Sequence, residues 1–151
     1  MIRIAAAVLL IATVSSFASA QERPSIKLEP GLWRVLIKSS QNGQSLPDKT
    51  ENRCYSAAEL DDLVKTFATL FADHDCTRSH AVSGKILTLS AACIEPAPQG
   101  GALVVNGEGS YVFEDDKHFT GSVVTTFTMP NQPSTAISLS KNAEYVSPCP
   151  N

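Results

Sequence analysis

Two cysteines, Cys76 and Cys93, flank a short turn signal, and this arrangement fixes how the surrounding segments pair. The stretches between each cysteine and the turn alternate polar and apolar side chains, which is typical of half-buried strands. A two-residue turn at Gly84-Lys85 pairs Ser83 with Ile86. The same register places the two cysteines directly opposite each other, where facing Cβ atoms lie within reach of a disulfide. The sequence therefore predicts an antiparallel hairpin closed by a Cys76–Cys93 bridge.

The N-terminus has the pattern of an export signal. A short positive region at residues 1–3 precedes an apolar run at residues 4–14, and Ala18-Ser19-Ala20 is the small-x-small pattern that a signal peptidase accepts. The apolar run is too short to span a bilayer as a stable helix. We expect residues 1–20 to be a signal peptide cleaved after Ala20, leaving no stable membrane span. The expected location is periplasmic or secreted, with a flexible leader at 21–29 and a single β-rich domain at 30–151.

Export determines how the four cysteines are interpreted. An even number in an oxidising compartment favours disulfides. A structural zinc site would bring two ligands close together as C-x2-C, and no such spacing occurs. With Cys76 paired to Cys93, elimination pairs Cys54 with Cys149. We expect no metal and no cofactor.

Composition excludes several classes of protein. Hydrophobic residues make up 43% and charged residues 18%, which is inconsistent with a disordered chain, a collagen or a coiled coil. The formal net charge is −3, and loss of Arg3 with the signal peptide makes it 11 − 15 = −4. Without a basic stripe the chain is not expected to bind nucleic acid.

One segment is expected to be helical. Ser56 and Glu59 form a capping-box pattern, in which each side chain accepts from the other residue's backbone amide. The segment then places apolar side chains at helical spacing, and we expect one amphipathic helix ending near Ala72. The apolar side of this helix consists of Leu60, Leu63, Val64, Phe67, Leu70 and Phe71.

The remaining segments read as strands at residues 31–38, 49–55, 103–113, 119–129 and 134–146. A second hairpin register pairs Phe113 with Phe119, Val105 with Phe127, and Tyr111 with Gly121, so that the tyrosine ring covers the glycine. The predicted fold is mainly β within the α+β class. It is a curled antiparallel meander sheet of about seven strands with one amphipathic helix packed against it. The sheet must curl because one helix covers only about two to three strands.

Several short motifs occur in a characteristic order. They are Pro30-Gly31-Leu32-Trp33, Cys54 before a helix, Cys76 and Cys93 around Ser83-Gly84, Phe119-Thr120-Gly121, and Pro148-Cys149. In this order the chain resembles the "domain of unknown function 3617" family of small exported bacterial proteins, over about residues 29–150. The resemblance implies a periplasmic, disulfide-bonded protein and supplies no catalytic residue.

Candidate chemistry is sparse. His74 lies in Asp73-His74-Asp75 and His118 in an acidic turn, and both are expected in solvated loops. No G-x-S-x-G elbow is present, and pairing the cysteines leaves no free thiol. We therefore expect a non-enzyme, with a hydrolase using His80 or His74 as the weakest alternative.

The expected function is binding of a small apolar ligand or of another envelope component. A pocket would open near Tyr111, Val123, Thr125 and Phe127 unless the helix fills the trough of the sheet. Arg78 and His80 share the face of Cys76, and are either polar anchors of that pocket or a sheet-edge pair that reaches solvent. A protein–protein device, such as an inhibitor of a periplasmic or foreign enzyme, is the alternative. The sequence identifies no ligand or partner.

Overall fold

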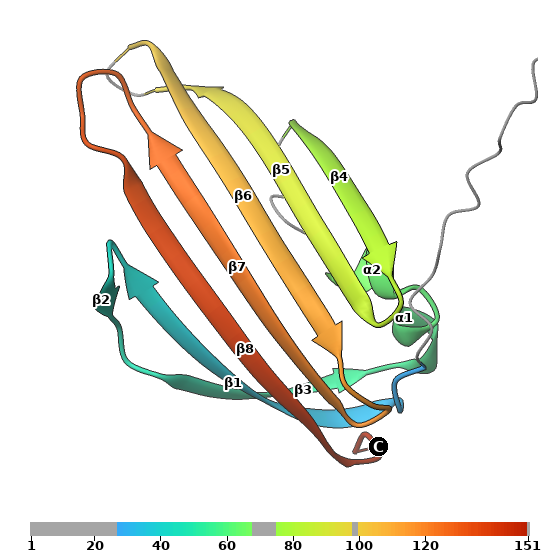
Figure 1. Ribbon diagram of the computed structural model, residues 1–151. Helices are drawn as coiled ribbons and strands as arrows, with labels where there is room; N and C mark the ends of the chain where they lie inside the picture. The colour runs from blue at the N-terminus through green and yellow to red at the C-terminus, as the bar shows by residue number, and fades with distance from the viewer. Residues whose placement is uncertain (1–26, 68–74, 98–99, 151) are drawn as a thin grey trace, which may run out of the picture.

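The computed structural model describes residues 27–67, 75–97 and 100–150, which form an eight-stranded sheet and two short helices (Figure 1). The signal peptide, residues 21–26 of the leader, the expected helix residues Leu70, Phe71 and Ala72, and Asp73-His74 lie outside the described residues. The elements are β1 (Gly31–Gln41), β2 (Gln44–Ser45), β3 (Lys49–Tyr55), α1 (Ala57–Leu60), α2 (Leu63–Phe67), β4 (Cys76–Ser83), β5 (Ile86–Pro96), β6 (Ala102–Phe113), β7 (His118–Thr128) and β8 (Thr135–Ser147).

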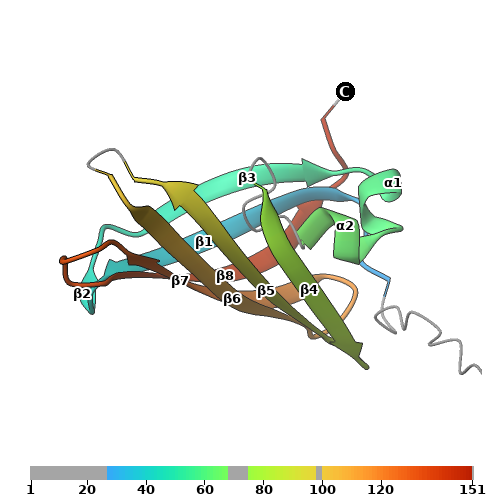
Figure 2. The ribbon, with the colours of Figure 1, turned by 90° about the horizontal axis from the view of Figure 1, so that it is seen from above.

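The sheet is antiparallel throughout, as predicted. Strands β4 to β8 follow one another as a meander, and β8 then pairs with β1. Strands β2 and β3 both pair with β1 on its other side, so β4 and the β2–β3 segment form the two edges of the described sheet. The sheet is curled, and both helices lie at one end of it (Figures 1 and 2). We call the face toward the helices the concave face and the opposite one the outer face.

Both predicted hairpin registers are confirmed. Cys76 pairs with Cys93, and Tyr111 pairs with Gly121. A Cβ atom on Gly121 would lie 2.5 Å from a ring carbon of Tyr111. Glycine is therefore required here, because the tyrosine ring occupies the space that any larger side chain needs.

Both predicted disulfides are confirmed. The Cα atoms of Cys76 and Cys93 are 4.4 Å apart, the separation of a non-hydrogen-bonded antiparallel pair. The Cα atoms of Cys54 and Cys149 are 5.7 Å apart, and this bridge joins the end of β3 to the C-terminus. The described cysteines include no free thiol.

The expectation of one continuous helix is wrong, because the segment breaks into α1 and α2 at Asp61-Asp62. The capping box at the start of α1 is present: the Glu59 amide donates to the Ser56 hydroxyl at 3.2 Å, and the Ser56 amide donates to the Glu59 carboxylate at 2.8 Å. Asp62 then accepts a hydrogen bond from the Lys65 amide at 2.9 Å. This carboxylate acts as a second N-cap, which favours a new helix start over continuation of the first.

Within the described residues, no helix is long and apolar enough to cross a membrane. The apolar side of α1 and α2 faces the sheet: Leu60, Leu63 and Phe67 are buried in the same hydrophobic cluster as Trp33 and Phe119. The predicted apolar side of the helical segment is therefore confirmed for its described residues, although the segment is broken into two helices.

Candidate functional site

The concave face divides into two ends that differ in side-chain size. The end beside the helices carries Trp33, Tyr55, Tyr111, Phe113 and Phe119, which we call the aromatic end. Farther along the same strands, the face carries Ala91, Gly107, Gly109, Val123 and Thr125, which we call the small-residue end. Because alternate residues of a strand share a face, this division follows directly from the sequence of each strand.

The helices fill the aromatic end. The ring of Phe67 lies 4.9 Å from that of Tyr111, 5.0 Å from Phe119 and 5.5 Å from Phe113. Trp33, Phe113 and Phe119 are at most 1% exposed. Burial also raises the pKa of Tyr55. This end is a packed core.

The small-residue end combines buried and half-buried side chains. On the β5, β6 and β7 side, Ala91, Val123 and Thr125 are buried. On the β1, β8 and β7 side, the apolar side chains of the concave face remain half-buried. We call this second group the apolar stripe, and it consists of Ile37, Leu139, Ile137 and Phe127.

The structure brings together three of the predicted ligand residues and separates the others. Val123, Thr125 and Phe127 lie in succession along β7 on the small-residue end. Tyr111 is on the same face but belongs to the aromatic end, where it packs on Phe67 and covers Gly121.

Arg78 and His80 lie on the edge strand β4, in register with the concave face, and both are exposed. In the row that contains Val123, His80 is three strands away, because β5 and β6 lie between. The Arg78 guanidinium donates to the Cys76 carbonyl oxygen at 3.4 Å. Of the two sequence interpretations, the structure favours a sheet-edge pair that reaches solvent.

Sequence reasoning missed the charged residues that β3 and β8 place on the concave face. Lys141 pairs with Ile37 across β8 and β1, so it stands on this face beside the apolar stripe. On β3, Lys49 and Arg53 pair with concave-face residues of β1, as does Glu51 between them. The sequence signal that could have found Lys141 is its position in phase with the apolar residues of its strand.

These charges interact at the β3 rim of the concave face. The Lys49 ammonium lies 2.9 Å from the Glu51 carboxylate. Its hydrogen bond is the main reason that the pKa of Glu51 lies below its usual value, and the charges of Lys141 and Arg53 contribute. The Arg53 guanidinium lies 4.6 Å from the centre of the Tyr55 ring and 3.8 Å from the Glu59 carboxylate.

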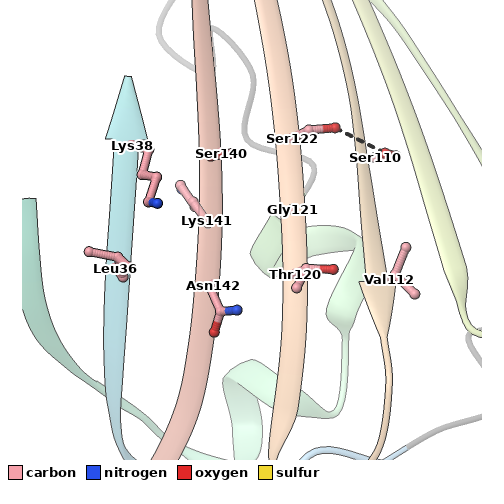
Figure 3. A pocket seen from close by; sticks show the side chains of 10 residues that line it. All are labelled: Leu36, Lys38, Ser110, Val112, Thr120, Gly121, Ser122, Ser140, Lys141 and Asn142. Carbon is pink, nitrogen blue, oxygen red and sulfur yellow. Dashed lines mark hydrogen bonds between the residues drawn. The ribbon is translucent and has the colours of Figure 1, made fainter. Parts of the chain in front are cut away.

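The outer face holds an open depression of about 440 Å³ (Figure 3). It lies across β1, β8, β7 and β6 on the side away from the helices, with Gly121 near its centre. Small polar residues and the apolar side chains of Leu36 and Val112 line it, and the hydroxyls of Ser110 and Ser122 lie 3.3 Å apart. Lys38 lines it from β1, and the depression also reaches Lys141 of β8, which the register places in phase with Ile37 of the concave face.

The other described histidine, His118, interacts with a carboxylate of its own turn. His118 Nδ1 lies 2.9 Å from the Asp115 carboxylate, which raises the pKa of His118 and lowers that of Asp115. Asp115 also accepts from the Lys117 amide at 2.8 Å. Among the residues that the structure describes, no three His, Cys, Asp or Glu side chains are grouped so as to hold a metal ion.

Comparison with known proteins identifies the family but no function. The family model described as "Protein of unknown function (DUF3617)" matches residues 28–149. No curated protein and no solved structure matched the chain. The matched segment contains both disulfides and every strand of the sheet. The chain belongs to the DUF3617 family.

Proposed function

We propose that this protein is a non-enzymatic cell-envelope module that binds a small apolar ligand at the small-residue end of its concave face. The observation that carries the proposal is the division of that face. The helices pack against the aromatic end, while apolar side chains on β1, β7 and β8 beyond them remain half-buried.

Side-chain chemistry supports binding of an apolar molecule. Sites for small molecules are mostly apolar with few polar groups. Among the described residues, Thr125 is the one buried polar residue, and it lies on the small-residue end. At Gly107 and Gly109, β6 projects no side chain toward the concave face, which leaves more space over this strand at this end.

The proposal places the protein in the periplasm or outside the cell, after cleavage of residues 1–20. Two disulfides are compatible with an oxidising compartment. The export pattern at the N-terminus supports the same location.

The test is binding of a neutral fluorescent apolar probe, N-phenyl-1-naphthylamine. Val123→Trp should abolish binding, because it places an indole over the small-residue end. Ile137→Trp should have the same effect from a half-buried position where a larger ring is easier to accommodate.

Val124→Trp is the matched control. Val124 is the next residue of β7 but lies on the outer face and is 45% exposed. This variant should bind the probe like the wild type. Unchanged binding by folded Val123→Trp and Ile137→Trp would rule out the proposed site.

A second candidate is binding of a protein partner, such as an enzyme that the module inhibits. Ile86 and Val112 are paired neighbours on the outer face and are 42% and 36% exposed. Val112 also lines the outer depression. If this face binds a partner, Val112→Lys should abolish a stoichiometric complex that Ile137→Trp leaves intact.

A further inference from the structure

One charged residue of the concave face lies among the apolar side chains of the central strands. Across β1, β6, β7 and β8, Lys141 is the one charged residue that the strand register places on this face. It is half-buried, with Ile37 opposite on β1 and Gly121 opposite on β7. A lysine beside apolar side chains loses hydration, and a bound anion would compensate for that loss.

The surroundings of Lys141 are positively charged, although the whole chain has a net charge of −3. Three cations, Lys49 and Arg53 of β3 and Lys141 of β8, act on Glu51, the one carboxylate that the register of β1, β3 and β8 places on the concave face. Even with Glu59 of α1 included, three cations face two carboxylates. This rim therefore has the opposite sign to the protein as a whole.

Lys141 also stands at the boundary between the two ends. The apolar stripe continues from it through Leu139 and Ile137 to Phe127. Lys141 and Thr135, the partner of Phe127, are six positions apart along β8, which corresponds to about 20 Å. That length suits an extended alkyl chain, with its polar end at the lysine.

We propose that the ligand is a single-chain amphiphile with an anionic headgroup. The headgroup contacts the ammonium groups of Lys141 and Lys49, and the alkyl chain lies along the apolar stripe. This inference rests on the proposed function and adds the charge and shape of the ligand to it.

The test is displacement of N-phenyl-1-naphthylamine by decanoate, by decanol and by acetate, below the concentrations at which the amphiphiles aggregate. For the wild type, decanoate should act at about tenfold lower concentration than decanol. Acetate should not displace the probe, because it has no chain.

Lys141→Met removes the charge and keeps an apolar stem. In this variant, and more fully in Lys49→Met/Lys141→Met, the preference for decanoate over decanol should fall toward one while affinity for the probe is retained. Lys38→Met is the matched control: it removes a lysine from the adjacent strand β1 on the outer face and should keep the tenfold preference.

The outcomes separate the two proposals. Failure of the wild type to bind the probe overturns the proposed function and this inference with it. Three results would overturn this inference alone while the wild type still binds the probe. Decanoate and decanol could displace the probe with equal potency, or the double variant could keep the full preference for decanoate. Acetate could also displace the probe at the same concentrations as decanoate.

Discussion

The two ends of the concave face are built from the same central strands and differ in what they do. At the aromatic end, large rings from β1, β6 and β7 meet Phe67 and pack a core. At the small-residue end, β5, β6 and β7 present alanine, glycine, valine and threonine, and the apolar stripe of β1, β7 and β8 is half-buried. The comparison shows that the rings of one end form the packed core, while the other end keeps a half-buried apolar stripe at which we propose that a ligand binds.

The largest expected effect on the free energy of unfolding comes from removing the disulfides, and it differs between the two. Cys54–Cys149 closes a loop of 95 residues and Cys76–Cys93 one of 17. Loop entropy predicts that Cys54→Ser/Cys149→Ser lowers the free energy of unfolding by about 4–5 kcal/mol and Cys76→Ser/Cys93→Ser by about 3 kcal/mol. Urea unfolding of both variants measures the difference, and the reverse order would contradict it.

The second prediction compares one side chain from each end. Phe67→Ala removes a ring from the aromatic end and should lower the free energy of unfolding by about 3–4 kcal/mol. Ile137→Ala acts on a half-buried side chain and should cost less than about 1.5 kcal/mol. Thermal denaturation followed by circular dichroism checks both values. A larger loss for Ile137→Ala would show that the small-residue end is part of the core.

A smaller effect is expected at the start of α1. Ser56→Ala removes the hydroxyl that accepts from the Glu59 amide, and should cost about 1 kcal/mol with ligand binding little changed. Chemical denaturation and a probe titration measure the two quantities. A neutral result would show that the capping box does not stabilise the aromatic end.

The smallest effect is the pH dependence of the exposed β6–β7 turn, which joins Phe113 to Phe119 of the aromatic end and lies away from the small-residue end. The raised pKa of His118 means that its contribution is full below its ordinary pKa of about 6.5 and is lost as pH rises through the folded value. The lowered pKa of Asp115 makes its contribution disappear as pH falls through the folded value. NMR titration should show both shifts in the wild type and a smaller lowering of the Asp115 pKa in His118→Gln, where the hydrogen bond from the Lys117 amide remains, with probe affinity unchanged.

Much of the fold could be predicted because local patterns and global register agree. The equal spacing of Cys76 and Cys93 on either side of a single turn predicted the register of the first hairpin. The pairing of Tyr111 with Gly121 agreed with the predicted register of the second. The break between α1 and α2 was missed because the apolar spacing continues through it. The competing signal was Asp62, whose carboxylate caps a new helix.

The candidate site was predicted only in part. Alternation along β7 placed Val123, Thr125 and Phe127 on one face, as observed. Lys141 was overlooked because its strand reads as apolar in that phase, and its proximity to Lys49 depends on the pairing of β8 with β1 and of β1 with β3. Neither pairing joins segments that a tight turn connects, so the sequence offered no register for them.

The most direct test of the central claim is a map of backbone amide NMR shifts as the neutral probe N-phenyl-1-naphthylamine is added to the mature protein. The account predicts that the largest changes occur at Val123, Thr125, Ile137 and Leu139, with small changes at Phe113 and Phe119. Changes centred on the outer depression, at Ser110, Thr120 and Ser122, would contradict it.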